Sequence, residues 1–189
     1  MTYESWKNSV PEEIRRDSVW RMEDYKLSLF AADLAWPDVS KLVRDRRTIS
    51  LSDQLFRSAG AVSSDVAEGY SRKSGKDQAR YYEYALGSAR EARNWCYEGR
   101  HVLGDRVATH RISLWTEIIK LLLTIIPEER GYKMAEEPVQ YRTGEVDLAD
   151  LLANVPLSDL GPDTEYAIRN TQYDKGTTQS DTRHSQRVF

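Results

Sequence analysis

The chain has 189 residues, of which 40% are hydrophobic and 30% are charged, and its formal net charge is -3. This composition excludes a collagen-like chain and a chain disordered throughout, and it favours one globular domain with a tail. No apolar run approaches the roughly 20 residues that cross a bilayer, so we expect no membrane partner. The start lacks an apolar leader, and Cys96 is the single cysteine. Both features indicate a cytoplasmic, reducing compartment.

Charge is unevenly distributed along the chain. Residues 41–111 contain 14 lysines and arginines against nine aspartates and glutamates, whereas residues 132–189 contain six basic and ten acidic residues. The low net charge therefore combines a basic centre with an acidic C-terminal region. It does not argue against a polyanionic partner for the centre.

The first long helix is expected after a cap at Asp17 or Ser18, with one apolar face. That face contains Trp20, Leu27, Phe30, Ala31 and Leu34. Pro37 is expected to break or kink this helix, because its ring removes a backbone donor. The residues that follow Pro37 fit either a short helix or a basic loop.

Three further helices are predicted. The second begins at Ser50 or Ser52 and closes at Gly69, and the third runs from a cap at Ser74 to about Leu103. The predicted buried seam of the third consists of Tyr81, Ala85, Ser88, Ala92, Trp95, Gly99 and Val102. The fourth carries Trp115, Ile118, Ile119, Leu122 and Ile125 before Pro127.

Short connections between these helices predict an all-α fold, an antiparallel up-down-up-down four-helix bundle. We divide the chain into an N-terminal arm (1–16), the bundle (17–131) and an acidic, largely disordered tail (132–189) with room for a short helix near 145–155.

The inventory for catalysis is thin, with three histidines and one cysteine. Cys96 lies beside the apolar seam, where a small buried hydrophobe is its usual role. Glu98 and His101 have the Glu-x-x-His spacing of di-iron bundles, but those centres need a second such motif and two more glutamates. The chain has no second copy, and it carries no Walker-type or dinucleotide-type glycine motif. We therefore expect no enzyme activity, no metal and no cofactor.

Basic residues gather at one predicted turn and along the third helix. Arg72, Lys73 and Lys76 crowd the turn before that helix, whose first backbone amides would add positive potential. Arg80, Arg90, Arg93 and Arg100 follow within the helix, and the spacing of the last three allows a shared stripe. These residues could contact nucleic-acid phosphates, or they could form ordinary surface salt bridges.

The run from Ser50 to Glu91 resembles the signature of a bacterial four-helix-bundle family. The matching elements are Asp53-Gln54-Leu55, Arg57-Ser58-Ala59, Ala67-Glu68-Gly69 with Arg72 and Ser74, and Ala85-Leu86-Gly87-Ser88 with Glu91. That family includes proteins encoded in intervening sequences of large-subunit ribosomal RNA genes and accessory variability proteins of diversity-generating retroelements. The resemblance covers about Ser18 to Arg130 and is closer to the intervening-sequence type. The tail lies outside it.

The resemblance implies a non-enzymatic, barrel-like homopentamer whose basic surface holds RNA or DNA and, in the retroelement branch, a reverse transcriptase. The matched basic positions are Arg57, Arg72 and Lys76. The matched Gln54, Glu68, Gly69, Gly87, Ser88 and Glu91 are interpreted as structural, with Gly69 at a helix end or turn and Gly87 at a close approach of helices. The alternative is a protein–protein adaptor, in which the bundle oligomerises and the tail docks a partner or masks the basic face.

Overall fold

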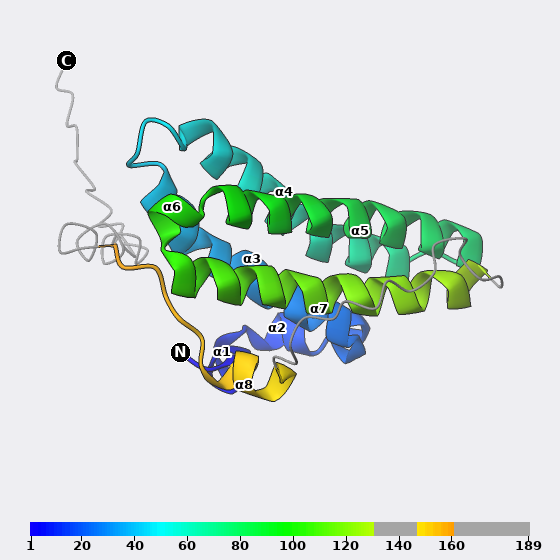
Figure 1. The fold of residues 1–189 in the computed structure, drawn as a ribbon. Coiled ribbons are helices and arrows are strands. Elements are labelled where there is room, and N and C mark those ends of the chain that lie inside the picture. The colour runs from blue at the N-terminus through cyan, green and yellow to red at the C-terminus, as the bar shows by residue number, and fades with distance from the viewer. Residues whose placement is uncertain (131–146, 161–189) are drawn as a thin grey trace, which may run out of the picture. The chain divides into compact units, whose positions relative to one another are not determined.

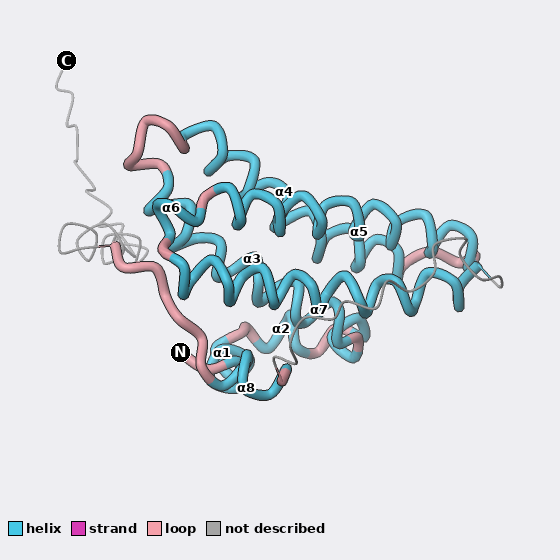
Figure 2. The backbone as a smooth tube through the Cα atoms, viewed as in Figure 1, coloured by secondary structure: helices cyan, strands magenta, loops and turns pink. Residues whose placement is uncertain are grey.

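Four long helices carry most of the described chain, which in this computed structural model comprises residues 1–130 and 147–160 (Figure 1). They are α3 (Glu23–Leu42), α4 (Ile49–Tyr70), α5 (Gly75–Glu98) and α7 (Asp105–Arg130). Every regular element within the described ranges is helical (Figure 2), which confirms the predicted all-α fold. None of these helices is long and apolar enough to cross a membrane.

Contacts at the helix ends establish the direction of the four helices. Lys41, near the end of α3, donates a hydrogen bond to the carbonyl oxygen of Leu103, just beyond α5 (3.3 Å). At the opposite end, Gly75 at the start of α5 lies against the carbonyl oxygen of Glu129 near the end of α7. Helices α3 and α5 therefore point one way, and α4 and α7 point the other.

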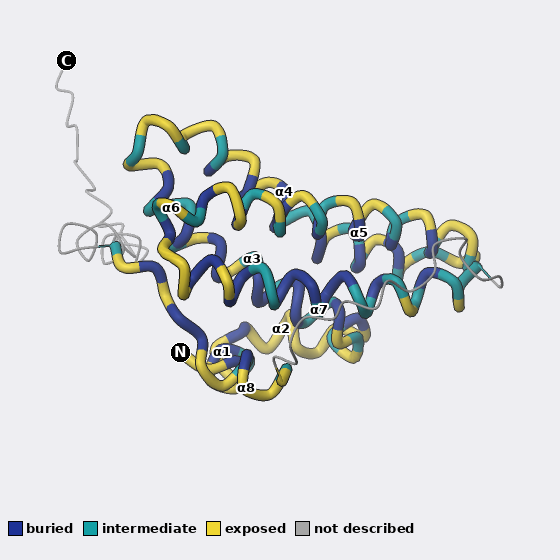
Figure 3. Tube along the Cα trace, in the orientation of Figure 1, coloured by how far each residue is buried: buried dark blue, intermediate teal, exposed yellow. Residues whose placement is uncertain are grey.

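The core lies between the four helices, as the buried inner segments in Figure 3 show. Large side chains come mainly from α3, α4 and α7, with Phe30, Leu55 and Ile118 fully buried. Helix α5 instead contributes mostly small buried residues, which allows its neighbours to approach closely. Its buried residues are Ala79, Tyr82, Ala85, Leu86, Ala89, Ala92 and Cys96.

The seam predicted for α5 is wrong by about one position. Tyr81, Ser88 and Trp95 are only half-buried, and the adjacent Tyr82, Ala89 and Cys96 are buried instead. Ala85 and Ala92 belong to both faces. The predicted continuous helix to Leu103 is interrupted at Gly99, which caps α5 and precedes the short helix α6 (Arg100–Leu103). Gly104 then turns the chain with φ of +89°, a conformation that favours glycine.

Pro37 does not break α3, and of the two alternatives for the residues after it the structure has a helix as far as Leu42. The helix continues for five residues beyond it, to Leu42. Asp38 and Leu42 on this last stretch are both buried, so packing on the far side of the proline compensates for the lost backbone bond. The cap predicted at Asp17 exists, but it starts the separate 3-10 helix η1 (Ser18–Arg21).

The predicted N-terminal arm is folded against the bundle. It contains α1 (Tyr3–Ser9) and α2 (Glu12–Arg15). Tyr3 and Trp6 are 4% exposed and place their rings 5.1 and 4.9 Å from that of Phe30 in α3. Aromatic burial thus fixes this segment to the outer side of α3.

Part of the predicted tail is also packed. Residues 147–159, here called the strap, begin with the helix α8 (Leu148–Ala153), which is capped by Asp147 and contacts α1 and α7. Leu151 and Val155 are buried, and Met1–Asp159 form one compact unit. The short helix for which the prediction left room near 145–155 is present as α8. The expectation of disorder is wrong for the rest of the strap, where Val155 and Ser158 are buried. The tail predictions for 132–146 and 161–189 lie outside the described residues.

Candidate nucleic-acid interface

The turn between α4 and α5 brings together four of the predicted phosphate-binding residues: Arg72, Lys73, Lys76 and Arg80, here called the turn group. Lys73, Lys76 and Arg80 are exposed. Ser74 caps α5 as predicted, with its hydroxyl accepting from the amide of Asp77. The turn group thus surrounds the N-terminal end of a long helix, where the helix dipole adds positive potential.

Acidic side chains and a tyrosine offset part of this charge. The Arg72 guanidinium donates to the carboxylate of Glu68 and to the Tyr81 hydroxyl (2.7 Å), and it stacks 4.4 Å from the centre of the Tyr81 ring. Arg80 lies 3.9 Å from Asp77. Lys73 and Lys76 make no ion pair with another described residue, so they are the cations of the turn group available to a phosphate.

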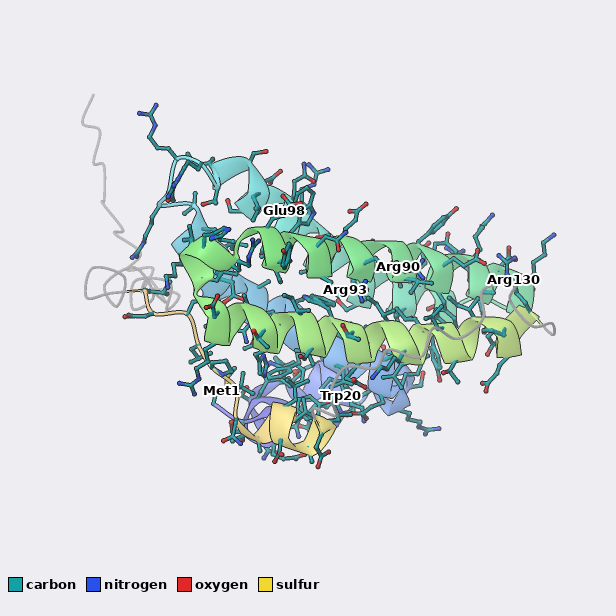
Figure 4. All side chains as sticks on the ribbon, viewed as in Figure 1. Met1, Trp20, Arg90, Arg93, Glu98 and Arg130 are labelled. Carbon is teal, nitrogen blue, oxygen red and sulfur yellow. The ribbon has the colours of Figure 1, made fainter. Side chains whose placement is uncertain are left out.

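The C-terminal end of α7 adjoins this turn. Arg130 pairs there with Glu83 of α5 at 2.5 Å, and Figure 4 shows Arg130 at the end of α7 beside the turn. This pair links α5 to α7 at the same end of the bundle where Gly75 meets Glu129. Contacts between α5 and α7 therefore hold in place the end of the bundle that carries the turn group.

Arg90 and Arg93 are half-buried side chains of α5 (Figure 4). Arg93 reaches the hydroxyl of Thr116 on α7 at 3.5 Å, and both arginines have further interactions. These two arginines are therefore less accessible than the exposed Lys73 and Lys76. The bond from Arg93 to Thr116 joins α5 to α7.

Arg100 is the first residue of the short helix α6, just beyond Gly99, the C-cap of α5. It donates to the carbonyl oxygen of Tyr97 (2.8 Å) and stacks 4.0 Å from the centre of that ring. Arg57 is separate from the others, on the exposed side of α4, 3.6 Å from Asp53. The structure thus brings four of the eight predicted residues together and distributes the other four along the bundle.

The matched motif residues have different surroundings. Gly69 lies in the last turn of α4, one residue before its end, as predicted, and an added Cβ would come within 2.6 Å of the Tyr82 ring, so close packing also favours glycine here. Gly87 is exposed, and no atom of another described element lies within 4 Å of the position that a Cβ would take there, so within residues 1–130 and 147–160 no other helix approaches it closely. Gln54, Glu68 and Glu91 are exposed, and Ser88 is half-buried.

The residues considered for metal binding and catalysis do not form a site among the described residues. Glu98 and His101 are exposed, and among the described residues no group of three or more His, Cys, Asp or Glu side chains could hold a metal ion. Cys96 is 1% exposed, and burial raises the pKa of its thiol to about 12. It is an unreactive core residue in this environment.

A buried charged cluster, which no sequence pattern predicted, lies on the other side of the bundle. Arg111 of α7 and Asp38 of α3 are each 1% exposed and paired, with Arg111 Nε donating to Asp38 Oδ2 at 2.7 Å. Arg111 also donates to the Pro156 carbonyl oxygen at 2.9 Å, and the Ser158 hydroxyl donates to Asp38 Oδ1 at 2.6 Å. The strap therefore completes the hydrogen bonding of this ion pair.

His110 joins the same cluster through both ring nitrogens. Nε2 lies 2.9 Å from the carbonyl oxygen of Leu151, which can only accept, so Nε2 carries the proton. Nδ1 then accepts from Arg111 Nη1 at 2.9 Å. Burial, together with the charge of Arg111, lowers the pKa of His110 to about 4. The ring is neutral at physiological pH.

One signal for this cluster is present in the sequence. Arg111 falls at a core position of the fourth helix, in step with Val107, Leu114 and Ile118. A charged residue at such a position requires a partner. Its partner Asp38 is 73 residues away in the chain, so no local pattern could identify it.

The four long helices match a known protein family. A family model for "23S rRNA-intervening sequence protein" matches residues 24–134, which is more than half of the chain. The chain belongs to this family. The match begins at the start of α3 and ends just beyond α7, so α1, α2 and the strap lie outside it. A comparison with curated proteins finds no match.

One solved structure is similar to this intervening-sequence protein. It is a protein of unknown function from the S23 ribosomal protein family of Bacteroides thetaiotaomicron VPI-5482. The TM-score is 0.51 at 24% sequence identity, and the similarity covers 55% of this chain and 97% of the other. At this identity the similarity supports the fold alone.

Proposed function

We propose that this intervening-sequence protein is a non-enzymatic, homo-oligomeric scaffold that binds RNA or DNA, alone or within a ribonucleoprotein, through its basic surface. The observation that carries the proposal is the turn group, with Lys73 and Lys76 exposed beside the start of α5. Such cations bind phosphates without reading sequence, and each contact makes the affinity more salt-dependent.

Exposed apolar residues support the oligomeric part of the proposal. Trp36 and Phe56 are 57% and 46% exposed, and their rings lie 5.8 Å apart on α3 and α4. Val43 and Ile49, near the same helix ends, are also about half exposed. Contiguous exposed apolar residues are typical of protein interfaces. In the pentamer that the resemblance implies, five turn groups would act together by multivalency.

The experiment is binding of the full chain to labelled single-stranded RNA and to duplex DNA over a series of salt concentrations. We expect the logarithm of the affinity to fall linearly with the logarithm of salt concentration. Light scattering on the same sample reports the oligomeric state. An intact oligomer that binds neither nucleic acid at low salt would overturn the proposal, and a monomer would overturn its oligomeric part.

The retroelement branch of the resemblance adds a reverse transcriptase as a protein partner. The genes beside this one test that addition. A neighbouring reverse transcriptase with a template repeat supports it, whereas location within a ribosomal RNA gene supports the intervening-sequence role alone.

The adaptor alternative places partner binding in the tail. Deleting everything after Gly131 would also remove the strap and expose the Arg111–Asp38 pair, so the two effects would be confounded. A deletion of 161–189 keeps the strap in place. If the tail masks the basic face, this deletion strengthens nucleic-acid binding; if it docks a partner, the deletion abolishes a pull-down and leaves nucleic-acid binding unchanged.

A further inference from the structure

We infer that Asp38, His110 and Arg111 form a binding site for an extended peptide, here called the strap site, and that residues 147–159 are its exchangeable resident ligand. The inference is independent of nucleic-acid binding. It rests on the contacts between the strap site and the strap. The three residues of the strap site lie within the range matched by the family model, and the strap lies outside that range.

The strap site is already organised within the bundle. The ion pair between Arg111 and Asp38 spans α7 and α3, and the bond from Arg111 to His110 fixes the imidazole. The strap supplies one hydrogen-bond partner to each of the three side chains: the Leu151 carbonyl to His110, the Pro156 carbonyl to Arg111 and the Ser158 hydroxyl to Asp38. Without a ligand, three buried polar groups would each lose a hydrogen-bond partner. Because an unpaired buried polar group costs free energy, this loss favours binding of a peptide.

The contacts define the chemistry of the ligand. His110 and Arg111 bind two main-chain carbonyl oxygens, of Leu151 and Pro156, which any peptide can present. Selectivity comes from the Ser158 hydroxyl on Asp38 and from the buried side chains of Leu151 and Val155. The expected ligand therefore has an apolar residue, a second apolar residue four positions later followed by proline, and a serine two positions after the proline.

Three features of the strap are typical of a bound peptide and not of a core helix: its short helix, its long connection to the bundle and its few buried residues. Helix α8 has six residues, too few to be stable without docking. Sixteen residues separate Arg130 from Asp147, so the tether is long enough for the strap to leave the site and return. Helix α8 contacts α1 and α7, and of its six residues Leu151 alone is buried. Such segments open at a lower free energy than the global fold.

The experiment cuts the tether of the full chain. A recognition sequence for a site-specific protease replaces residues 134–139, and cleavage then leaves the strap as a separate fragment without any change in the strap site. A labelled synthetic peptide of residues 147–159 is added to the cut and the uncut protein. Circular dichroism monitors the helical content of both.

We expect the cleaved fragment to co-elute with the bundle and to be displaced by excess labelled peptide. Uncut protein should take up far less peptide, because its own strap competes at a high effective concentration. A peptide with Ser158→Ala should bind about 10- to 100-fold more weakly, since it removes a hydrogen bond to a charged group. The matched control, Leu157→Ala, changes a side chain that is 51% exposed and should bind like the unmodified peptide.

Three results would overturn the inference. The first is a cut protein that remains helical but neither retains the fragment nor binds the peptide, which would show that no peptide site exists. The second is a fragment that stays bound and never exchanges with excess peptide, which would make the strap a permanent part of the core. Equal binding of the Ser158→Ala peptide would remove Asp38 from the site.

Discussion

Two glycines of the family signature should respond to alanine with opposite signs. Gly69 is buried in α4, and an added Cβ would lie 2.6 and 2.9 Å from two atoms of the Tyr82 ring and 3.2 Å from Tyr81 Cβ. Tyr82 is 2% exposed, so its ring has little room to move. Overpacking of this kind costs about 1–3 kcal/mol. Because the Tyr82 ring cannot move away, we take the overpacking cost to be about 3 kcal/mol. Alanine regains about 1 kcal/mol of helix propensity, so Gly69→Ala should lower the free energy of unfolding by about 2 kcal/mol.

Gly87→Ala is the matched control. Gly87 is exposed in the middle of α5 with no atom within 4 Å of a Cβ position, so only the propensity gain of about 1 kcal/mol remains. Urea denaturation followed by circular dichroism, at one protein concentration for all variants, measures both changes. A Gly69→Ala variant as stable as the unmodified protein would refute the close packing of Tyr82 on α4.

Three further predictions concern the interior. Asp38→Ala should destabilise by about 3–5 kcal/mol in urea denaturation, because it leaves Arg111 buried without its counter-ion; a change below about 1 kcal/mol would show that water reaches the pair. The free energy of unfolding should fall as the pH drops from about 6.5 to 4. In this range the unfolded chain binds a proton at His110, whereas folded His110, with a pKa of about 4, stays neutral. His110→Gln should remove that part of the pH dependence, and a variant that keeps it would contradict the role given to His110. Cys96 should react with a thiol reagent only after unfolding, and rapid labelling of the native protein would contradict its burial.

Much of the fold could be predicted because its signals are local. The cap at Ser74 and the apolar spacing of Leu27, Phe30, Ala31 and Leu34 in α3 each lie within a few residues, and the structure confirms them. The predicted buried face of α5 is displaced because alanines line the true face and aromatic residues flank it on both sides. Burial of Tyr82 in place of Tyr81 depends on which neighbouring helix each ring meets, and a single helix does not contain that information.

The remaining features depend on contacts distant in the chain. The continuation of α3 through Pro37 depends on Asp38, which pairs with a residue on α7. The position of the strap depends on the same pair. The predicted stripe assumed one unbroken helix, whereas Gly99 caps α5 and Arg100 begins α6, where it contacts Tyr97.

The salt dependence of RNA binding by a turn-group variant tests the central claim most directly. We predict that replacing Lys73 and Lys76 by glutamine weakens binding of single-stranded RNA and reduces the slope of log affinity against log salt by about 1.4 per turn group engaged. The control replaces the exposed Arg16 and Arg21, which removes the same charge from the N-terminal region. It should leave the slope nearly unchanged. Equal slopes for the unmodified protein and the lysine variant would contradict nucleic-acid binding through the turn between α4 and α5.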